Sequence, residues 1–181
     1  GKTIFNNDKR KCINCDQISY LGKDYPIIKD SYLTVLSPQT AYQMTSILEG
    51  VVKRGTAKKI KDLKLNIAGK TGTTNKNTDT WFVGFTSNLL VGVYVGADNP
   101  MPLGKYETGS KTALPVFKNF IKEAVKKSDA RPFKAAKETI MMVVDPNTGQ
   151  KAKFTSKNTI IEVFKKKNLL NGKVLFSNTD R

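Results

Sequence analysis

The sequence of 181 residues contains no histidine. This absence excludes the Ser-His-Asp and Cys-His catalytic mechanisms, together with every zinc site built on imidazole ligands. A hydrolase or acyl transferase on this chain would need a lysine to carry protons. We predict neither a metal site nor a cofactor.

Long apolar runs are also absent. No stretch approaches the ~20 apolar residues that span a bilayer, and the first residues, Gly1-Lys2-Thr3-Ile4, lack the pattern of a signal peptide. We therefore expect any membrane anchor to belong to a part of the protein that is not in this chain.

Acidic residues are scarce, because 15 Asp and Glu face 31 Lys and Arg, which gives a formal net charge of +16. The resulting field favours anionic partners such as nucleic acid, anionic lipid or an acidic wall polymer. Composition does not choose among them. Hydrophobic residues make up 39% of the chain, as in an ordinary globular protein.

The two cysteines, Cys12 and Cys15, lie in a loop rich in Lys, Asn and Asp. They are open to three interpretations: a local disulfide or redox-sensitive pair, half of a zinc site, and two reduced, inert thiols. We favour the disulfide, because the chain holds no further Cys or His to complete a zinc site. The strand-then-helix setting of a thioredoxin-type centre is missing.

Hydrophobic periodicity predicts helices packed on an antiparallel sheet, an α+β arrangement. A helix is predicted over 38–54, where Ser37 can cap the helix and Pro38 fits its first position. Its apolar stripe, which includes Met44 and Ile47, is predicted to pack on the sheet, and the Lys-rich stretch 58–61 is predicted to be a connector. A second helix is predicted over 112–127. The predicted strands of the meander are 65–74, 81–86 and 89–96, with a short turn at Ser87-Asn88.

Three segments follow from these patterns. Residues 1–36 are predicted to form a loop-rich lead-in, the incomplete start of a domain, and 37–130 the main domain. Residues 131–181 are predicted to be a small basic extension that contains β structure, with a strand over 139–144 and a tight turn over 145–149. The spacing of Asp145 and Asn147 resembles the start of a calcium loop, but the later ligands are absent.

The motif Lys70-Thr71-Gly72-Thr73-Thr74 organises the main domain. Lys-Thr-Gly is one of three short motifs of serine β-lactamases and penicillin-binding proteins. Its flanks, Asp79-Thr80-Trp81-Phe82-Val83-Gly84-Phe85 and Gly92-Val93-Tyr94-Val95-Gly96, extend the match. The chain resembles the C-terminal part of the transpeptidase domain of class A (bifunctional) penicillin-binding proteins, so we expect a partial penicillin-binding-protein/serine β-lactamase-like fold.

The resemblance implies a serine that attacks the D-Ala-D-Ala carbonyl of a peptidoglycan stem peptide, and an acyl-enzyme that an amine then resolves. It implies that Lys70 supports the catalytic hydroxyl network and that the backbone N–H of Thr73 belongs to the oxyanion hole, a term worth ~3–4 kcal/mol per donor. Substrate binding falls to Thr71, Gly72, Thr73 and Thr74, with the strand edge binding the peptide. β-Lactams would bind the complete domain.

The chain departs from the family pattern because it contains no Ser-x-x-Lys. Ser156-Lys157-Asn158 matches Ser-x-Asn only formally, since that motif precedes Lys-Thr-Gly in the family. We therefore expect the chain to be inactive alone and to need the N-terminal remainder of the protein or domain. The implied location is periplasmic, at the outer face of the cytoplasmic membrane. The alternative is a non-catalytic module that binds peptidoglycan or an anionic polymer, and a nucleic-acid-binding domain ranks last because no such motif is present.

Overall fold

The computed structural model describes residues 11–13, 27–29, 34–126, 131–153, 155–166, 169–170 and 173–174. The chain divides into two compact units, Gly1–Ser37 and Pro38–Arg181. In the first unit, β1 (Lys11–Ile13) pairs antiparallel with β2 (Ile27–Lys29), a strand pair that the sequence patterns did not predict. Cys15 lies outside the described residues, as does the side chain of Cys12, so the disulfide stays a prediction.

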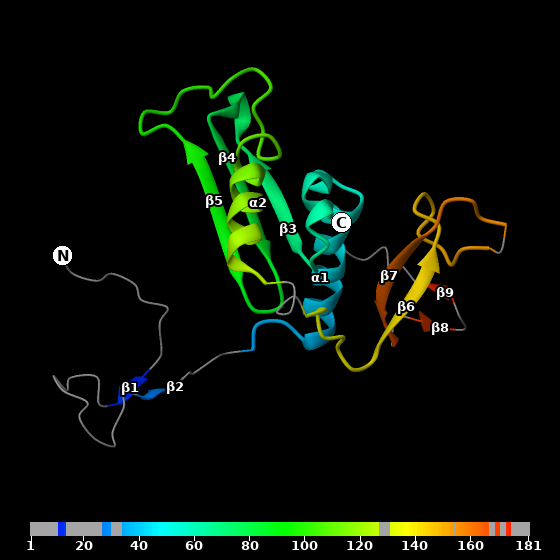
Figure 1. Ribbon diagram of the computed structural model, residues 1–181. Coiled ribbons are helices and arrows are strands. Elements are labelled where there is room, and N and C mark those ends of the chain that lie inside the picture. Colours follow the sequence, from blue (N-terminus) through cyan, green and yellow to red (C-terminus); the bar gives the residue numbers. More distant parts are fainter. Residues whose placement is uncertain are drawn as a thin grey trace. The chain divides into compact units, whose positions relative to one another are not determined.

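The second unit is built on an antiparallel sheet with the strand order β3-β4-β5 (Figure 1). Its strands are β3 (Ala68–Thr73), β4 (Asp79–Phe85) and β5 (Leu90–Gly96). The predicted meander is confirmed, but β3 begins three residues later than predicted. The reason is that Ala68 pairs with Phe85, the last residue of β4, so the preceding residues have no ladder partner on that strand.

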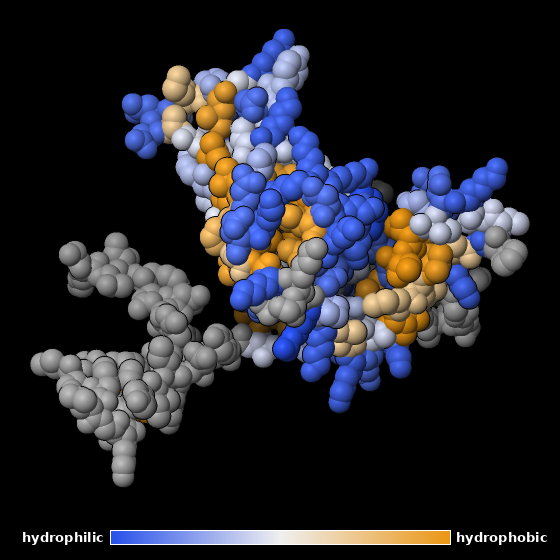
Figure 2. Space-filling model, in the orientation of Figure 1, coloured by the Kyte–Doolittle hydropathy of each residue, from blue (hydrophilic) through white to orange (hydrophobic). Residues whose placement is uncertain are grey.

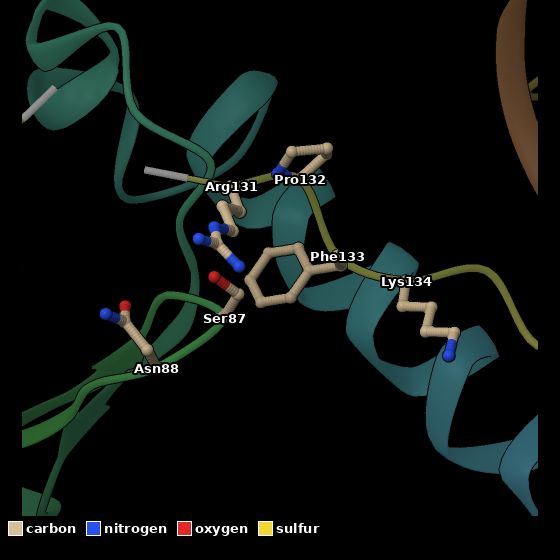
Figure 3. A pocket seen from close by; sticks show the side chains of 6 residues that line it. All are labelled: Ser87, Asn88, Arg131, Pro132, Phe133 and Lys134. Atoms are coloured by element: carbon tan, nitrogen blue, oxygen red, sulfur yellow. The ribbon is translucent and has the colours of Figure 1, made fainter. Parts of the chain in front are cut away.

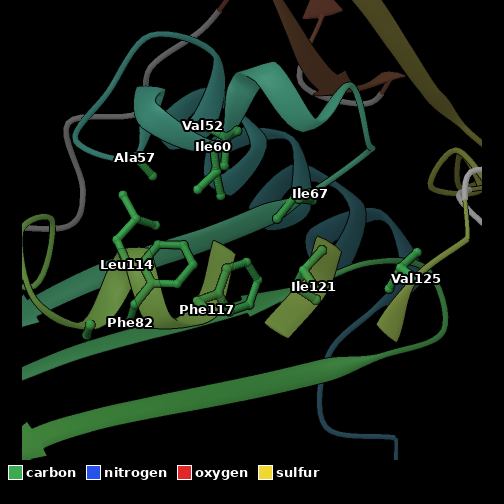
Figure 4. Close-up of a cluster of buried hydrophobic side chains, with 10 residues drawn as sticks. Val52, Ala57, Ile60, Ile67, Phe82, Leu114, Phe117, Ile121 and Val125 are labelled. Atoms are coloured by element: carbon green, nitrogen blue, oxygen red, sulfur yellow. The ribbon is translucent and has the colours of Figure 1, made fainter. Parts of the chain in front are cut away.

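Helix α2 (Ala113–Ala124) covers one face of this sheet. Phe117 and Phe82 are fully buried between the two, with ring centroids 4.7 Å apart in an edge-to-face arrangement. Gly84 belongs to this interface, because a Cβ there would lie 2.6 Å from the Phe82 ring and 2.7 Å from the Phe117 ring. The buried cluster in Figure 4 comprises Val52, Ala57, Ile60, Ile67, Phe82, Ala113, Leu114, Phe117, Ile121 and Val125.

Helix α1 (Pro38–Lys53) begins at the predicted proline and contacts β3. Only its C-terminal part enters the core, through Val52. Met44 and Ile47, which the apolar periodicity assigned to a buried stripe, are 46% and 52% exposed. This half of the predicted stripe therefore has no cover among the described residues.

Other elements also differ from the predicted ones. The Lys-rich stretch after α1 was expected to be a connector, but it forms a 3₁₀ helix, η1 (Lys58–Leu63), because Ile60 is buried in the core while its lysines stay outside. Helix α2 ends at Ala124, because Val125 has extended backbone angles.

Strands β6 (Thr139–Val144) and β7 (Ile160–Lys165) form an antiparallel hairpin. Strand β6 has its predicted bounds, whereas β7 was not predicted. The hairpin packs on α1, where the side chain of Gln43 donates to the carbonyl of Val163 (3.0 Å) and Arg54 pairs with Glu162. Its outer surface carries the exposed apolar residues Met141, Val143 and Ile161, and Figure 2 shows orange atoms over this hairpin.

The remaining short elements are the 3₁₀ turn η2 (Asn75–Asn77) and the strand pair β8 (Leu169–Leu170) and β9 (Lys173–Val174). In the part of the chain that the structure describes, no helix has both the length and the apolar character needed to cross a membrane.

Candidate functional site

The Lys-Thr-Gly motif lies on β3, the strand at one edge of the sheet. Ala68 and Gly69 are buried, whereas the strand is exposed or half-buried from Lys70 to Thr73. In the ladder, Lys70 stands opposite Val83 and Gly72 opposite Trp81. Because side chains alternate along a strand, Lys70 and Gly72 share the sheet face that α2 does not cover, while Thr71 and Thr73 face the other way.

The backbone N–H of Thr73 points away from β4, toward the open edge of the sheet. The N–H of Thr74 donates to the carbonyl of Asp79 at the start of β4 (3.0 Å). Backbone groups of neighbouring residues on a strand point to opposite edges. The N–H of Thr73 therefore lies on the outer edge of β3, beyond the sheet, where a bound group can reach it.

The ammonium group of Lys70 lies close to the strand that carries it. Its Nζ donates to the carbonyl oxygen of Thr71 (2.9 Å) and approaches Thr71 Oγ1 (3.4 Å). The Thr71 hydroxyl also lies 3.0 Å from that of Thr56, which follows α1. Lys70 and Thr71 thus form one polar group at the exposed edge.

A hydrogen-bonded turn follows the motif. The Asp79 carboxylate accepts from the hydroxyls of Tyr94 (2.7 Å), Thr78 (3.0 Å) and Thr74 (3.4 Å), and the Asp79 N–H donates to Thr74 Oγ1 (2.9 Å). The hydrogen bond from Tyr94, followed by that from Thr78, holds the pKa of Asp79 below its ordinary value of 3.8. The same carboxylate raises the pKa of Tyr94 above 10.0, because an ionised phenol would lose this hydrogen bond.

The loop between β5 and α2 contacts the end of β3 on the sheet face that α2 covers. The N–H of Gly109 donates to Thr73 Oγ1 (3.2 Å). A Cβ at Gly109 would lie 2.4 Å from the carbonyl oxygen of Trp81 and 2.7 Å from that of Gly72, so only glycine fits this approach. Thr112 lies at the end of the same loop, and its Oγ1 is 2.6 Å from Oγ1 of the buried Thr80.

Ser156 does not join this group. It lies in the connection between β6 and β7, where its Oγ accepts from the N–H of Lys153 (3.1 Å). A local turn therefore explains this serine, and the formal Ser-x-Asn match stands apart from β3. Among the described residues, no group of three or more His, Cys, Asp and Glu side chains could hold a metal ion.

A separate cavity of about 570 Å³ lies beside the turn between β4 and β5 (Figure 3). This turn is at the opposite end of the strands from the turn that follows the motif. The cavity is lined by Ser87, Asn88, Arg131, Pro132, Phe133 and Lys134. None of the residues predicted from the motif contributes to it.

Comparison with known proteins identifies the class. The family model of the penicillin-binding protein transpeptidase domain matches residues 29–122. The chain therefore belongs to the penicillin-binding protein transpeptidase family, and its partial α+β fold is the one predicted from the resemblance.

The individual relatives are more specific. Penicillin-binding protein 1A of Rickettsia felis is 41% identical over 172 residues, which are 93% of this chain and 21% of that protein. The protein of the same name from Pseudomonas aeruginosa is 37% identical over 132 residues, 72% of this chain and 16% of that protein. The crystal structure of Penicillin-Binding Protein 1A from Haemophilus influenzae superposes with a TM-score of 0.62 at 31% identity, covering 72% of this chain and 20% of that one. The chain thus spans about a fifth of the length of these relatives.

Three residues around the motif escaped the sequence analysis: Asp79, Tyr94 and Gly109. Asp79 and Tyr94 were noted only as members of the segments that flank the motif, and Gly109 was not singled out. The contact between the first two could have been found from the Ser87-Asn88 turn, because a hairpin centred there sets Asp79 opposite Gly96 and diagonal to Tyr94. No pattern in the sequence indicates that Gly109 returns to β3.

Proposed function

We propose that this chain supplies the Lys-Thr-Gly side of the active site of a peptidoglycan D-Ala-D-Ala transpeptidase, which works by an acyl-serine mechanism and is inhibited by β-lactams. The observation that carries the proposal is the exposed Lys70–Thr73 edge on β3 in a chain of this family. The nucleophile comes from outside this chain, because no Ser-x-x-Lys occurs in it.

Each residue of the edge has a role in this proposal. Lys70 holds the catalytic hydroxyl network through its positive charge, and Gly72 leaves room for the substrate backbone. The outward N–H of Thr73 stabilises the oxyanion, and the hydroxyls of Thr73 and Thr74 serve the terminal carboxylate of the stem peptide, while Thr71 belongs to the substrate-binding edge. The peptide lies along the open edge of β3 as an added strand.

The location and the partners follow from the same proposal. The protein acts at the outer face of the cytoplasmic membrane, and its partners are the stem peptide and the remainder of the transpeptidase domain. Its formal charge of +16 favours a surface of anionic lipid or acidic wall polymer.

A chimera tests the proposal. This chain replaces the matching segment of Penicillin-binding protein 1A of Rickettsia felis, a relative with which it aligns over 93% of its length. We expect the chimera to react with a fluorescent penicillin, because the rest of that protein supplies the other parts of the site.

Lys70→Ala in the chimera should slow acylation by roughly 10²-fold or more, since it removes a charge that acts on the reacting groups. The matched control is Lys61→Ala, which removes an exposed lysine on η1 and should leave the rate unchanged. Equal rates for the Lys70 and Lys61 variants would contradict the proposed role. A folded chimera that binds wall peptides without being acylated would favour the alternative, a binding module.

A further inference from the structure

The Asp79 carboxylate and the Tyr94 hydroxyl join two strands behind the motif. Asp79 is the first residue of β4, and Tyr94 lies on β5 diagonal to it across the ladder. Their hydrogen bond is 2.7 Å long, the shortest of the three that the carboxylate accepts from hydroxyl groups. We call this pair, with the turn residues Thr74 and Thr78 that it holds, the Asp79 clamp.

The sheet provides a specific space for the clamp at Gly96. This residue stands directly opposite Asp79, and a Cβ on it would lie 2.1 Å from the hydroxyl oxygen of Tyr94 and 2.7 Å from Asp79 Oδ1. Gly96 is not among the glycines with positive φ in the described chain, which are Gly104 and Gly149. Glycine is therefore needed at this position because any side chain would block the contact of Tyr94 with Asp79. The backbone conformation of Gly96 does not itself require glycine.

The clamp acts on the end of β3 through reciprocal hydrogen bonds. The Asp79 N–H donates to Thr74 Oγ1 (2.9 Å), and the Thr74 N–H donates to the Asp79 carbonyl (3.0 Å). Thr74 directly follows Thr73, whose N–H lies on the outer edge. A shift of Asp79 would therefore shift the adjoining peptide unit, while Gly109 holds the Thr73 hydroxyl from the opposite side.

We propose that Asp79 and Tyr94 are positioning residues of the transpeptidase site: they fix the turn after the Lys-Thr-Gly strand so that Thr73 presents its N–H to the reacting carbonyl. This inference rests on the proposed function. Neither side chain need touch the substrate, because the effect passes through Thr74. Oxyanion donors work through preorganised geometry, so a small displacement is enough to slow the chemical step.

The test uses the chimera and two variants that weaken the clamp from different sides. Tyr94→Phe removes the hydroxyl group that donates to Asp79. Gly96→Ala pushes that hydroxyl group away without substituting any residue of the clamp. The matched controls are Tyr106→Phe, at a tyrosine whose ring lies beside the ammonium groups of Lys105 and Lys111, and Val116→Ala, at a valine on α2 that is 52% exposed.

Two readouts are measured on each protein. Stopped-flow acylation by penicillin separates the rate constant of the chemical step from the affinity of the preceding complex, and hydrogen exchange with mass spectrometry follows peptides over residues 70–80. We expect both clamp variants to slow the chemical step about 10- to 100-fold, less than the roughly 10²–10³-fold of a lost donor. Their affinities should change much less, their exchange over 70–80 should be faster, and the controls should match the unsubstituted chimera.

The inference is overturned if the clamp variants have the same acylation rate constants as their controls. It is also overturned if the variants weaken only the affinity of the preceding complex and leave the rate constant of the chemical step unchanged. If the unsubstituted chimera itself is not acylated, the proposed function fails, and the exchange data still decide about the clamp. In that case faster exchange in both clamp variants supports its positioning of the strand end, and unchanged exchange refutes it.

Discussion

A single carboxylate, that of Asp79 at the start of β4, connects β5 to the turn between β3 and β4. Its acceptor oxygens satisfy hydroxyl groups from Tyr94, Thr78 and Thr74. Hydrogen bonds to an ionised group are stronger than those between neutral groups, so the clamp depends on the charge of Asp79. The Asp79 carboxylate is therefore a titratable group close to the predicted oxyanion donor, the N–H of Thr73.

This charge predicts a pH dependence. Since the folded-state pKa of Asp79 is held below its ordinary value of 3.8, its stabilising contribution is fully present above pH 3.8 and is lost as the pH falls through the lowered value. The difference in urea midpoint between the parent chain and Asp79→Asn should thus be constant from pH 7 to pH 5 and shrink on further acidification. A difference that grows below pH 3.8 would contradict this sign.

Helix α2 shows how one amphipathic element builds the platform beneath the site. Its buried residues Leu114, Phe117 and Ile121 pack on the face of β4 and β5, and Thr112 reaches the hydroxyl of Thr80 just before the helix starts. The helix thereby ties the loop that holds Gly109 to the sheet. The geometry at the end of β3 depends on this packing.

Two phenylalanines on α2 give a matched test of that packing. Phe117 is fully buried and Phe120 is 50% exposed. Phe117→Ala should lower the free energy of unfolding by about 3–5 kcal/mol, because it removes a large buried ring and leaves a cavity. Phe120→Ala should cost less than about 1 kcal/mol. Urea unfolding followed by the fluorescence of Trp81, the chain's sole tryptophan, checks both, and equal losses would contradict the packing.

Elements with strong local signals could be predicted from the sequence. The Ser37-Pro38 start of α1, the turn at Ser87-Asn88 and the strand 139–144 depend on local chemistry, and the structure has them at or within a residue of those positions. The motif identified the exposed edge of β3 for the same reason.

The elements that were missed depend on tertiary contacts. Strand β7 is a strand because β6 pairs with it, and η1 forms because Ile60 finds the core. The apolar stripe of α1 predicted that Met44 and Ile47 are buried, but both are exposed. Periodicity identifies the side chains that share a helix face, but it does not say whether another element packs on that face. The Asp79 clamp requires the register of β4 and β5, which becomes evident only once the hairpin is placed.

In the second unit, the sheet face that α2 does not cover carries both charged and apolar side chains. It carries Lys70 together with the exposed side chains of Trp81, Val83, Leu90 and Tyr94. Apolar side chains gathered in this way mark surfaces that other parts of a protein cover. A nucleophile that works with Lys70 must approach this same face, so we expect the segment that carries it to bury these residues.

Val83, directly opposite Lys70, tests this expectation in the chimera. Val83→Asp should sharply reduce both acylation and thermal stability, because it buries a carboxylate under the covering segment and pairs it with Lys70, whose free charge the reaction needs. Val116→Asp is the control, at a valine on α2 that is 52% exposed, compared with 42% for Val83. A Val83 variant as stable and as reactive as its control would show that this face stays open.

The central claim is that this chain supplies one side of a penicillin-reactive site without its nucleophile. Intact-mass spectrometry after incubation with penicillin tests it most directly, on the chain alone and on the chimera, followed by peptide mapping of any adduct. We predict no adduct on the chain alone and one per chimera, attached to a serine outside this chain. A stoichiometric adduct on a serine of this chain, with Ser156 the first to examine, would contradict the claim.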